Sequence, residues 1–359
     1  MNNAHVIVGM SGGVDSSVSA YLLKEQGYQV SGLFMVNWTE DEEGYCTSAQ
    51  DFQDARAVCD ELSIPLHRVD FSKEYREKVF QNFLADYAAG KTPNPDVLCN
   101  REVKFQPFRE HAFRLGADFI ATGHYARIEH GSEGPRLLRG VDDNKDQTYF
   151  LAAVARQNFE RVLFPVGELT KPEVRAIAQK IGLPNHRKKD STGICFIGER
   201  EFQEFLSRYL KPKPGPIVGD DGREIGTHQG LMYYTLGQRR GLKIGGQSGA
   251  KEAPWYVVAK EEASNRLVIS QDAQHPRLMS HRVLTAPFQW IRQPIAPTQL
   301  LTARIRHRQA LQNCSIQVAA NGCVDVTFSA AQRAATPGQY LVLYDGEECL
   351  GGGEIASAH

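Results

Sequence analysis

The stretch that most constrains the fold lies near the start of the chain, at residues 6–17, Val-Ile-Val-Gly-Met-Ser-Gly-Gly-Val-Asp-Ser-Ser. Its first three residues form an apolar run that is typical of a buried β-strand, and residues 9–15 form a glycine-rich turn. From Val14 onward the apolar residues recur at helical spacing, and Gly27 stands where such a helix would end. A strand, a tight turn and a helix in this order present backbone N–H groups and the positive end of the helix dipole to an anion. The stretch therefore predicts a phosphate-binding turn.

The side chains of this turn suit a phosphate ligand. Gly12 and Gly13 carry no Cβ, so the backbone can approach phosphate oxygens closely. Ser11 and Ser16 add hydroxyl donors. Asp15 cannot bind a phosphate directly, which indicates either a Mg²⁺ bridge or a structural hydrogen bond. The turn lacks both the Gly-Lys-Ser/Thr of a Walker A loop and the G-x-G-x-x-G of a dinucleotide-binding turn.

Strand-like and helix-like segments alternate through the first 210 residues. Further buried strands are predicted at 30–38, 66–71 and 118–122, and helices at 48–62, 72–89, 171–181 and 199–210. This alternation is typical of an α/β fold with a doubly wound parallel sheet. Ligands of such sheets bind beyond the carboxyl ends of the strands, so the loops after Val8, Met35 and Thr122 are expected to converge on one nucleotide.

A proline-rich run at 211–216, Lys-Pro-Lys-Pro-Gly-Pro, predicts a domain boundary. We therefore expect an α/β catalytic domain at 1–211, a small β-rich central domain at 212–278 and a C-terminal antiparallel β-barrel at 279–359.

Two segments of the third domain carry specific predictions. Residues 315–328 alternate around Asn321-Gly322, which predicts a β-hairpin with a type I′ turn. Residues 301–308 also alternate, and this pattern places three arginines on one strand face: Arg304, Arg306 and Arg308. From the pattern alone such a face is more often solvated than bound to RNA.

The composition argues against some classes of protein, but it does not indicate a binding partner. The chain has 359 residues, with 41 basic against 42 acidic side chains and a net charge of −1. Bulk charge therefore gives no sign of a nucleic-acid partner, and any nucleic-acid-binding surface must be a local patch. No run of about 18 apolar residues is present, so no membrane span is expected. The first residues lead straight into a strand without signal-peptide architecture, which favours the cytoplasm.

The chain holds 7 cysteines, and none of them forms a C-x-x-C pair. A disulfide scaffold or a Cys₄ zinc site is therefore not expected, and we predict no metal-ligand cluster. In a reducing compartment most of these thiols should be buried, with one or two reactive. We expect structural roles for five of them: Cys46, Cys59, Cys314, Cys323 and Cys349.

Cys99 is the first of the two cysteines that invite a chemical role. It lies in residues 92–101, Thr-Pro-Asn-Pro-Asp-Val-Leu-Cys-Asn-Arg, where two X-Pro steps favour an extended loop. The following residues are helical in pattern up to Pro107, so Cys99 is predicted at a helix N-terminus, which would lower the pKa of its thiol. Asp96 is placed to act as a general acid or base. The alternative is a buried structural thiol.

Cys195 is the second candidate, in residues 190–198, Asp-Ser-Thr-Gly-Ile-Cys-Phe-Ile-Gly. Its apolar neighbours also fit core packing. The basic run at 186–189 either lowers the pKa of a nearby thiol, forms a solvated face or contacts RNA. The spacing of Cys99 and Cys195 does not show whether the two thiols meet.

Seven motifs, in order, carry a resemblance to a known family. The turn matches S-G-G-x-D-S, the PP-loop of ATP pyrophosphatases. It is followed by P-N-P-D-x-L-C-N, A-T-G-H-Y-A, K-D-Q-x-Y-F-L, D-S-T-G-I-C-F, Y-T-x-G-Q-R-x-G-L and P-G-Q with a late G-G-G-x-I. Together they resemble tRNA-specific 2-thiouridylases, over nearly the whole chain from Gly9 to Ile355. The resemblance implies a Rossmann-like PP-loop domain and an ATP-dependent sulfurtransferase that replaces the C2 oxygen of the wobble uridine of tRNA with sulfur.

The resemblance also implies binding roles for individual residues. ATP and, through it, Mg²⁺ would be held by Gly9, Met10, Ser11, Gly12, Gly13, Val14, Asp15, Ser16, Met35 and Gly123. The target base would be contacted by Asn94, Pro95 and Asp96. Further tRNA contacts would come from His124, Lys145, Asp146, Gln147, Arg306, His307 and Gln339.

The catalytic roles fall on the two cysteines. By the resemblance, Cys195 receives sulfur as a persulfide, and Cys99 is the second catalytic thiol, able to form a disulfide with Cys195 during turnover. The implied partners are tRNA, through its anticodon region, and a sulfur-relay protein or cysteine desulfurase.

Two other functions fit parts of the sequence. Another PP-loop enzyme, such as an amide-forming ligase that adenylates a carboxylate, would not need Cys99 and Cys195. A non-enzymatic RNA-binding protein would not need Asp15 in an intact loop. Both features are present, which favours the thiouridylase.

Overall fold

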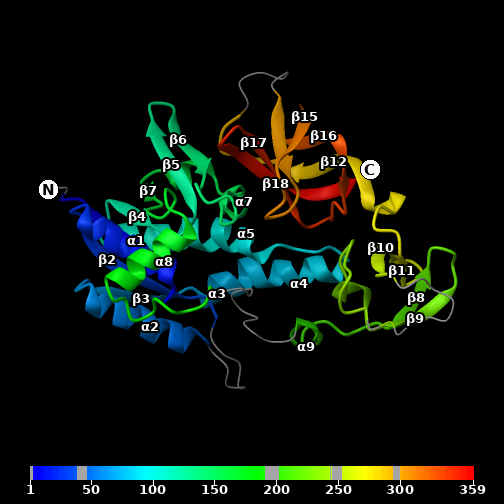
Figure 1. The fold of residues 1–359 in the computed structure, drawn as a ribbon, viewed down its shortest axis with the longest axis horizontal. Helices are drawn as coiled ribbons and strands as arrows, with labels where there is room; N and C mark the ends of the chain where they lie inside the picture. The colour runs from blue at the N-terminus through cyan, green and yellow to red at the C-terminus, as the bar shows by residue number, and fades with distance from the viewer. Residues whose placement is uncertain (1–2, 39–46, 191–201, 243, 245–252, 294–299) are drawn as a thin grey trace.

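The computed structural model describes residues 3–38, 47–190, 202–242, 244, 253–293 and 300–359 (Figure 1). These residues form three β-sheets, with most helices gathered on the first. No helix within these ranges is long and apolar enough to cross a membrane.

The first sheet is parallel and has the strand order β3-β2-β1-β4-β7. Its strands are β1 (His5–Met10), β2 (Gln29–Val36), β3 (Leu66–Asp70), β4 (Phe119–Ala121) and β7 (Val162–Leu163). The strand order reverses between β1 and β4, so the sheet is doubly wound as predicted, and the carboxyl ends of β1 and β4 meet at one edge.

Alternation along β1 explains why helices cover both faces of this sheet. Val6 and Val8 point to one side and pack with α1 (Val14–Glu25), α2 (Thr47–Glu61) and α8 (Lys171–Lys180). Ile7 points to the other side and joins a larger apolar cluster that includes Phe83, Phe105 and Phe108. A strand buried on both faces needs this continuous apolar run.

The second helical layer comes from residues 72–114. Its elements are α3 (Ser72–Tyr75), the π-helical η1 (Arg76–Phe80), α4 (Gln81–Ala88), α5 (Pro95–Cys99), the π-helical η2 (Asn100–Phe108) and α6 (Arg109–Arg114). The predicted helix at 72–89 is present with a π-helical stretch inside it. Pro107 lies within η2, and Phe105 departs from helical geometry (φ −99°, ψ 17°), so the helix is kinked here.

A β-hairpin that sequence patterning missed connects the first sheet to the barrel. Strands β5 (Ala126–Gly131) and β6 (Gly134–Arg139) follow β4, and β6 pairs with the barrel strand β18 at Leu138 and Glu348. In Figure 1 the hairpin stands between the parallel sheet and the barrel. The short helices α7 (Thr148–Leu151) and η3 (Arg156–Phe159) come next.

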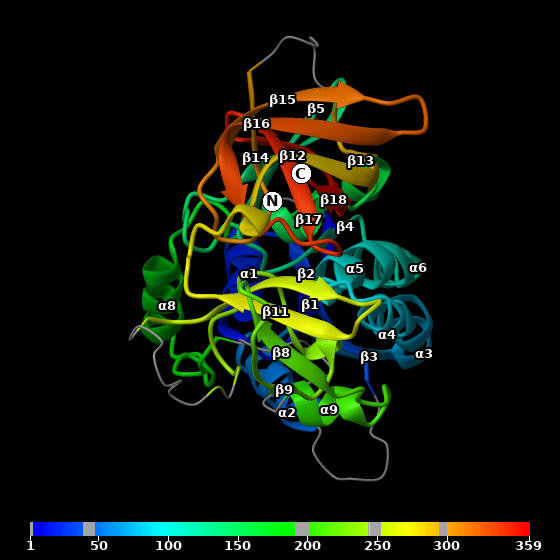
Figure 2. The ribbon, with the colours of Figure 1, turned by 90° about the vertical axis from the view of Figure 1, so that its right-hand side faces the viewer.

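The second sheet has four strands in the order β10-β11-β8-β9 (Figure 2). The strands are β8 (Gly215–Gly219), β9 (Glu224–His228), β10 (Tyr256–Glu261) and β11 (Arg266–Ser270), accompanied by α9 (Phe202–Ser207) and η4 (Leu231–Tyr233). Val218, Val258 and Val268 form its small core.

The third sheet closes into the predicted antiparallel barrel. Its circuit runs β12-β16-β15-β14-β17-β18 and returns to β12. The strands are β12 (Met279–Pro287), β14 (Leu301–Arg304), β15 (Gln312–Val318), β16 (Cys323–Arg333), β17 (Tyr340–Asp345) and β18 (Glu348–Ala358), with β13 (Gln289–Trp290) added beside β18 and η5 (Pro276–Leu278) leading into β12. Closure removes free strand edges.

Two local predictions in the barrel are wrong. The hairpin β15–β16 is present, but φ is positive at Gly322 (+80°) and not at Asn321, so the turn is not type I′. The arginines do not share a strand face, because β14 ends at Arg304 and the chain then turns, with Arg308 at φ +68°. Arg304 is buried at 3% exposure, facing the interior instead of solvent.

Candidate active site

The glycine-rich turn lies where the sequence predicted it, between β1 and α1. Gly12 has φ +74°, and a Cβ there would come within 2.3 Å of the carbonyl oxygen of Asp51 in α2. Glycine is therefore required at this position by backbone conformation and by contact with α2.

Hydroxyl groups shape the turn from inside. The Ser16 and Ser17 hydroxyls donate to the carbonyl of Gly13 over 3.0 and 2.9 Å, and the backbone N–H of Ser11 donates to Ser16 Oγ over 3.3 Å. The four-residue spacing of Ser17 and Gly13 is the i−4 pattern of a helix side chain bonding to its own backbone. These hydrogen bonds fix the conformation of the turn.

Asn185 supports the turn from a distant part of the sequence, and sequence reasoning missed it. Its Nδ2 donates to the carbonyl of Gly12 and to Ser17 Oγ, each over 2.9 Å. Its Oδ1 is buried and accepts no hydrogen bond from any described residue. A buried acceptor of this kind needs a donor such as ordered water, because phosphate oxygens are themselves acceptors.

Gly123 brings the loop after β4 against the start of α1. A Cβ on Gly123 would lie 2.7 Å from the backbone nitrogen of Ser16 and 2.8 Å from the carbonyl carbon of Asp15. Contacts that short do not occur, so only glycine allows this approach. The loops that follow Val8 and Thr122 therefore meet, as expected. Their convergence with the loop after Met35 on one nucleotide stays a prediction.

Of the two roles considered for Asp15, a Mg²⁺ bridge and a structural hydrogen bond, the structure shows the hydrogen bond. Its Oδ1 accepts hydrogen bonds from the Tyr125 hydroxyl (2.7 Å) and from Lys171 Nζ (2.6 Å). Burial, together with the charge of Asp15, raises the pKa of Tyr125, so this hydroxyl remains a donor. Lys171 is the second residue of the site that sequence patterning did not identify.

A cluster of cations surrounds Asp190, next to the turn. Lys145, Lys171 and Arg175 all reach its carboxylate, over 2.6 to 2.9 Å. Burial by itself would raise the pKa of Asp190, but the hydrogen bonds from Lys145 and Lys171 hold it well below the ordinary value.

The basic run at 186–189 is partly neutralised, since Lys188 pairs with Asp51 and Asp54 of α2.

The position of Cys99 differs from the prediction. The helix α5 begins at Pro95, with Asn94 as its N-cap accepting from the N–H of Val97 over 3.3 Å, so Cys99 is the last residue of α5. Cys99 therefore does not lie at a helix N-terminus, the position that we expected. The Cys99 side chain is buried at 2% exposure.

Asp96 lies in the first turn of α5, and burial raises its pKa, partly opposed by the charge of Lys104. A carboxyl group with a raised pKa is suited to donate a proton. His124 is buried in the same domain, with its Nδ1 2.7 Å from Thr122 Oγ1. Burial lowers the pKa of His124 well below its ordinary value, so the ring is neutral.

Cys195 lies outside the described residues, and so does its expected pairing with Cys99. The remaining cysteines of the described chain are buried, apart from the half-buried Cys323.

Three consecutive residues of the first domain are predicted to contact tRNA, and in the structure each of them has different partners. Lys145 belongs to the cation cluster around Asp190. Asp146 is 1% exposed and pairs with Arg304 Nη2 of the barrel over 3.1 Å, so its side chain links two domains. Gln147 Oε1 accepts from the N–H of Tyr125 over 2.9 Å.

The predicted tRNA contacts of the barrel meet the first domain. His307 Nε2 lies 3.1 Å from the carbonyl of Asp146, and Arg306 donates to the carbonyls of Arg333 and Ala334. Gln339 Nε2 donates to the carbonyl of Thr92 over 2.8 Å, which ties the barrel to the segment that leads into α5.

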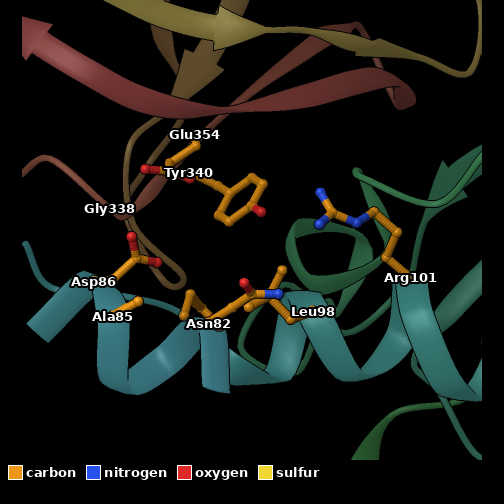
Figure 3. Close-up of a pocket in the computed structure, with 9 residues that line it drawn as sticks. Asn82, Ala85, Asp86, Leu98, Arg101, Gly338, Tyr340 and Glu354 are labelled. Carbon is orange, nitrogen blue, oxygen red and sulfur yellow. The ribbon is translucent and has the colours of Figure 1, made fainter. Parts of the chain in front are cut away.

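A cavity of about 230 Å³ lies at this junction (Figure 3). Tyr340 and Glu354 come from the barrel, facing Asp86 of α4 and Arg101 of η2 across the space. Burial and the charge of Glu354 raise the pKa of Asp86, while Lys91 pairs with both carboxylates. The full lining is Asn82, Ala85, Asp86, Asn94, Leu98, Arg101, Gly338, Tyr340 and Glu354.

The geometry defines a class of protein: a PP-loop-type α/β nucleotide-binding domain that is joined through a second sheet to a closed β-barrel. Family models agree with this class. A tRNA methyl transferase HUP domain model matches residues 4–199, a tRNA methyl transferase PRC-barrel domain model matches 203–271, and an aminomethyltransferase beta-barrel domain model matches 280–355.

Full-length relatives then specify the family. The tRNA-specific 2-thiouridylase MnmA of Alcanivorax borkumensis is 56% identical over 98% of this chain and 97% of the relative. The proteins of that name from Sodalis glossinidius and Escherichia coli K12 are 57% and 56% identical, each over 98% of this chain and 96% of theirs. The chain belongs to the tRNA-specific 2-thiouridylase family, although the family models carry the words methyl transferase.

Proposed function

We propose that this protein is an ATP-dependent tRNA 2-thiouridylase, a sulfurtransferase that acts on the wobble uridine of tRNA. The observation that carries the proposal is the intact PP-loop in a chain that matches 2-thiouridylases from end to end. The turn is preformed by Ser16 and Ser17, approached by Gly123, and bordered by the unsatisfied Oδ1 of Asn185.

The PP-loop, residues 9–16, supplies the backbone N–H groups and hydroxyls for the phosphates of ATP. Met35 and Gly123 are the proposed neighbours of the adenosine. Mg²⁺ accompanies ATP and neutralises phosphate charge.

ATP is needed because the C2 oxygen of uridine is a poor leaving group. Transfer of AMP to this oxygen, with loss of pyrophosphate, converts it into a good one. A sulfur nucleophile can then attack C2, AMP leaves, and 2-thiouridine remains. Asp96, with its raised pKa, is the proposed general acid or base beside the target base, together with Asn94 and Pro95.

The sulfur is proposed to arrive as a persulfide on Cys195. Either its outer sulfur attacks C2 and Cys99 then cleaves the remaining S–S bond, or Cys99 first releases hydrosulfide, which attacks C2. Both routes leave a Cys99–Cys195 disulfide that an external thiol must reduce. Since Cys99 is 2% exposed, α5 or its neighbours must move before this thiol reacts.

The proposed partners are tRNA and a sulfur-relay protein or cysteine desulfurase, and the proposed compartment is the cytoplasm, where these substrates are found. The wobble base must leave the anticodon stack to reach a buried site, at a cost of a few kcal/mol. His124, Gln147, Arg306, His307 and Gln339 remain proposed contacts for the RNA. Asp146 is buried, so its contact would use backbone atoms or follow a rearrangement.

The test is single-turnover thiolation of tRNA that carries an unmodified wobble uridine, with ATP and a persulfide donor. The wild type is compared with Cys99→Ser, Cys195→Ser and, as a matched control, Cys323→Ser, a half-buried cysteine of the barrel. We expect 2-thiouridine and AMP from the wild type and the control alone.

Two results would contradict the proposal. If both catalytic variants thiolate normally, the two-thiol mechanism is wrong. If the wild type consumes ATP and leaves every tRNA unchanged, the chain is a different PP-loop enzyme, and carboxylate substrates become the next candidates.

A further inference from the structure

The carboxylate of Asp190 is bound in the manner of a phosphate group. Lys145 Nζ reaches its Oδ2 over 2.6 Å, while Lys171 Nζ and Arg175 Nη2 reach its Oδ1 over 2.9 and 2.7 Å. Two ammonium groups and one guanidinium around a single anion make a donor set typical of phosphate recognition. An ordinary structural ion pair needs one cation.

The cluster lies at the phosphate-binding turn. Lys171 Nζ, which reaches Asp190, also reaches Asp15 Oδ1 of the PP-loop over 2.6 Å. The Lys171 side chain is 9% exposed, so it is held in this place, and it is the first residue of α8, which packs on α1. One ammonium group thus connects the turn to the cation cluster.

The cations of this cluster are already matched by carboxylates, so a further anion would have to compete for them. Lys145, Lys171 and Arg175 pair with Asp15 and Asp190. A third carboxylate, that of Asp142, accepts a hydrogen bond from the backbone N–H of Lys171 over 2.9 Å. A polyphosphate that reached these cations would compete with Asp190 for them.

We propose that Lys171, with Lys145 and Arg175, forms a subsite for the β- and γ-phosphates of ATP and for the released pyrophosphate, and that Asp190 is a built-in anion that these phosphates displace. The inference rests on the proposed use of ATP at the PP-loop. It assigns Lys145 to the nucleotide, where the family resemblance gave it to tRNA.

If Asp190 competes with phosphate groups for these cations, removing the Asp190 charge should strengthen phosphate binding. Asp190→Asn keeps the size of the side chain and loses the charge, so ATP and pyrophosphate should bind roughly three- to tenfold more tightly. AMP lacks the phosphates in question, so its affinity should change less than about twofold. The same variant should have a lower Tm, because it loses three ion pairs.

The experiment is calorimetric titration of the full chain with ATP, inorganic pyrophosphate and AMP, each with Mg²⁺. The matched control is Asp143→Asn, which removes an exposed carboxylate from the neighbouring loop. A second pair compares Lys171→Met with Lys180→Met, an exposed lysine at the end of the same helix. Lys171→Met should lose most ATP and pyrophosphate affinity, and both controls should match the wild type.

Each outcome decides the inference. Tighter ATP and pyrophosphate binding by Asp190→Asn, with AMP unchanged, supports it. Weaker or unchanged ATP binding overturns it, the weaker case indicating that Asp190 holds Mg²⁺ or orders the cations. Tighter tRNA binding without tighter ATP binding also overturns it and assigns the cluster to RNA phosphates. A wild type that binds no ATP at all overturns the proposed function along with it, which separates the two failures.

Discussion

The phosphate-binding turn and the α5 segment that carries Cys99 are held in place by different means. The turn is shaped by its own serines and by Asn185 and Gly123, all from the first domain. The approach to α5 is held by the barrel, through Gln339.

The contacts at α5 span more than two hundred positions of sequence. The N–H of Thr92 donates to the carbonyl of Pro337 over 2.9 Å, and Gln339 donates back to Thr92. The contacts that shape the proposed nucleotide-binding turn therefore come from one domain, whereas the segment leading to Cys99 also depends on contacts with the barrel. Under the proposed function, this arrangement lets RNA bound at the barrel influence Cys99 without disturbing ATP.

The largest expected effect tests the link between the domains at Asp146. Asp146→Ala leaves the buried Arg304 without its carboxylate partner, which should cost about 3–5 kcal/mol of stability. The measurement is denaturant unfolding, beside Arg282→Ala, which breaks the exposed pair with Asp325 and should cost about 0–1 kcal/mol. If Asp146→Ala keeps full stability and loses only tRNA affinity, the residue contacts RNA and the structural role is wrong.

The second prediction tests how tightly the turn is confined. Gly12→Ala adds a Cβ against the backbone of Asp51 at positive φ, so it should cost about 2–4 kcal/mol and most ATP affinity. Gly182→Ala is the control, since Gly182 has a similar φ of +72° and no atom within 4 Å of the added Cβ. It should cost about 1 kcal/mol. Equal losses in both variants would show that backbone strain, not contact with α2, makes glycine necessary.

The difference between local and long-range contacts also explains which features could be predicted from the sequence. The PP-loop, the strands of the parallel sheet and the barrel hairpin depend on neighbours in the chain, and patterns of spacing reveal them. Asn185, Lys171 and the Asp146–Arg304 pair depend on residues more than a hundred positions away, and no local pattern marks them.

The errors at α5 and β14 have local causes. Two X-Pro steps predict an extended loop, but Pro95 is the first residue of a helix that Asn94 caps, a position where proline is favoured. The alternation after Leu301 continues past Arg304 in the sequence, although the strand ends there. Periodicity does not show where a strand stops.

The third prediction concerns the hydrogen bonds between the barrel and the segment that leads into α5. Gln339→Ala removes the hydrogen bonds to Thr92 and Pro93 and should cost about 1–2 kcal/mol. It should also increase the rate at which a thiol reagent modifies Cys99, while ATP affinity stays unchanged. Gln312→Ala is the control, because Gln312 bonds locally to Ala310. A fall in ATP affinity equal to the change at Cys99 would show that the two sites are not independent.

The smallest expected effect is a pH dependence at Asp96. Burial raises the pKa of Asp96 above its unfolded value, so the folded state holds this proton more tightly. Stability from this group is therefore present below the unfolded pKa of about 3.8 and is lost as pH rises through the raised folded value. Asp96→Asn should remove that loss and be relatively more stable at neutral pH, even as thiolation falls.

Asp70 serves as the comparison, because its pKa is shifted in the opposite direction from that of Asp96. Hydrogen bonds from Ser72 lower the pKa of Asp70, so its contribution is present above the unfolded pKa and is lost as pH falls through the lowered folded value. Asp70→Asn should therefore be less stable than the wild type at neutral pH. Tm measured from about pH 2 to pH 7 for both variants checks the pair, because Asp70 loses its contribution only below about pH 3.8, whereas Asp96 loses its contribution above that pH. If the two shift in the same direction, burial does not control Asp96, and its assignment as the proton donor loses its physical basis.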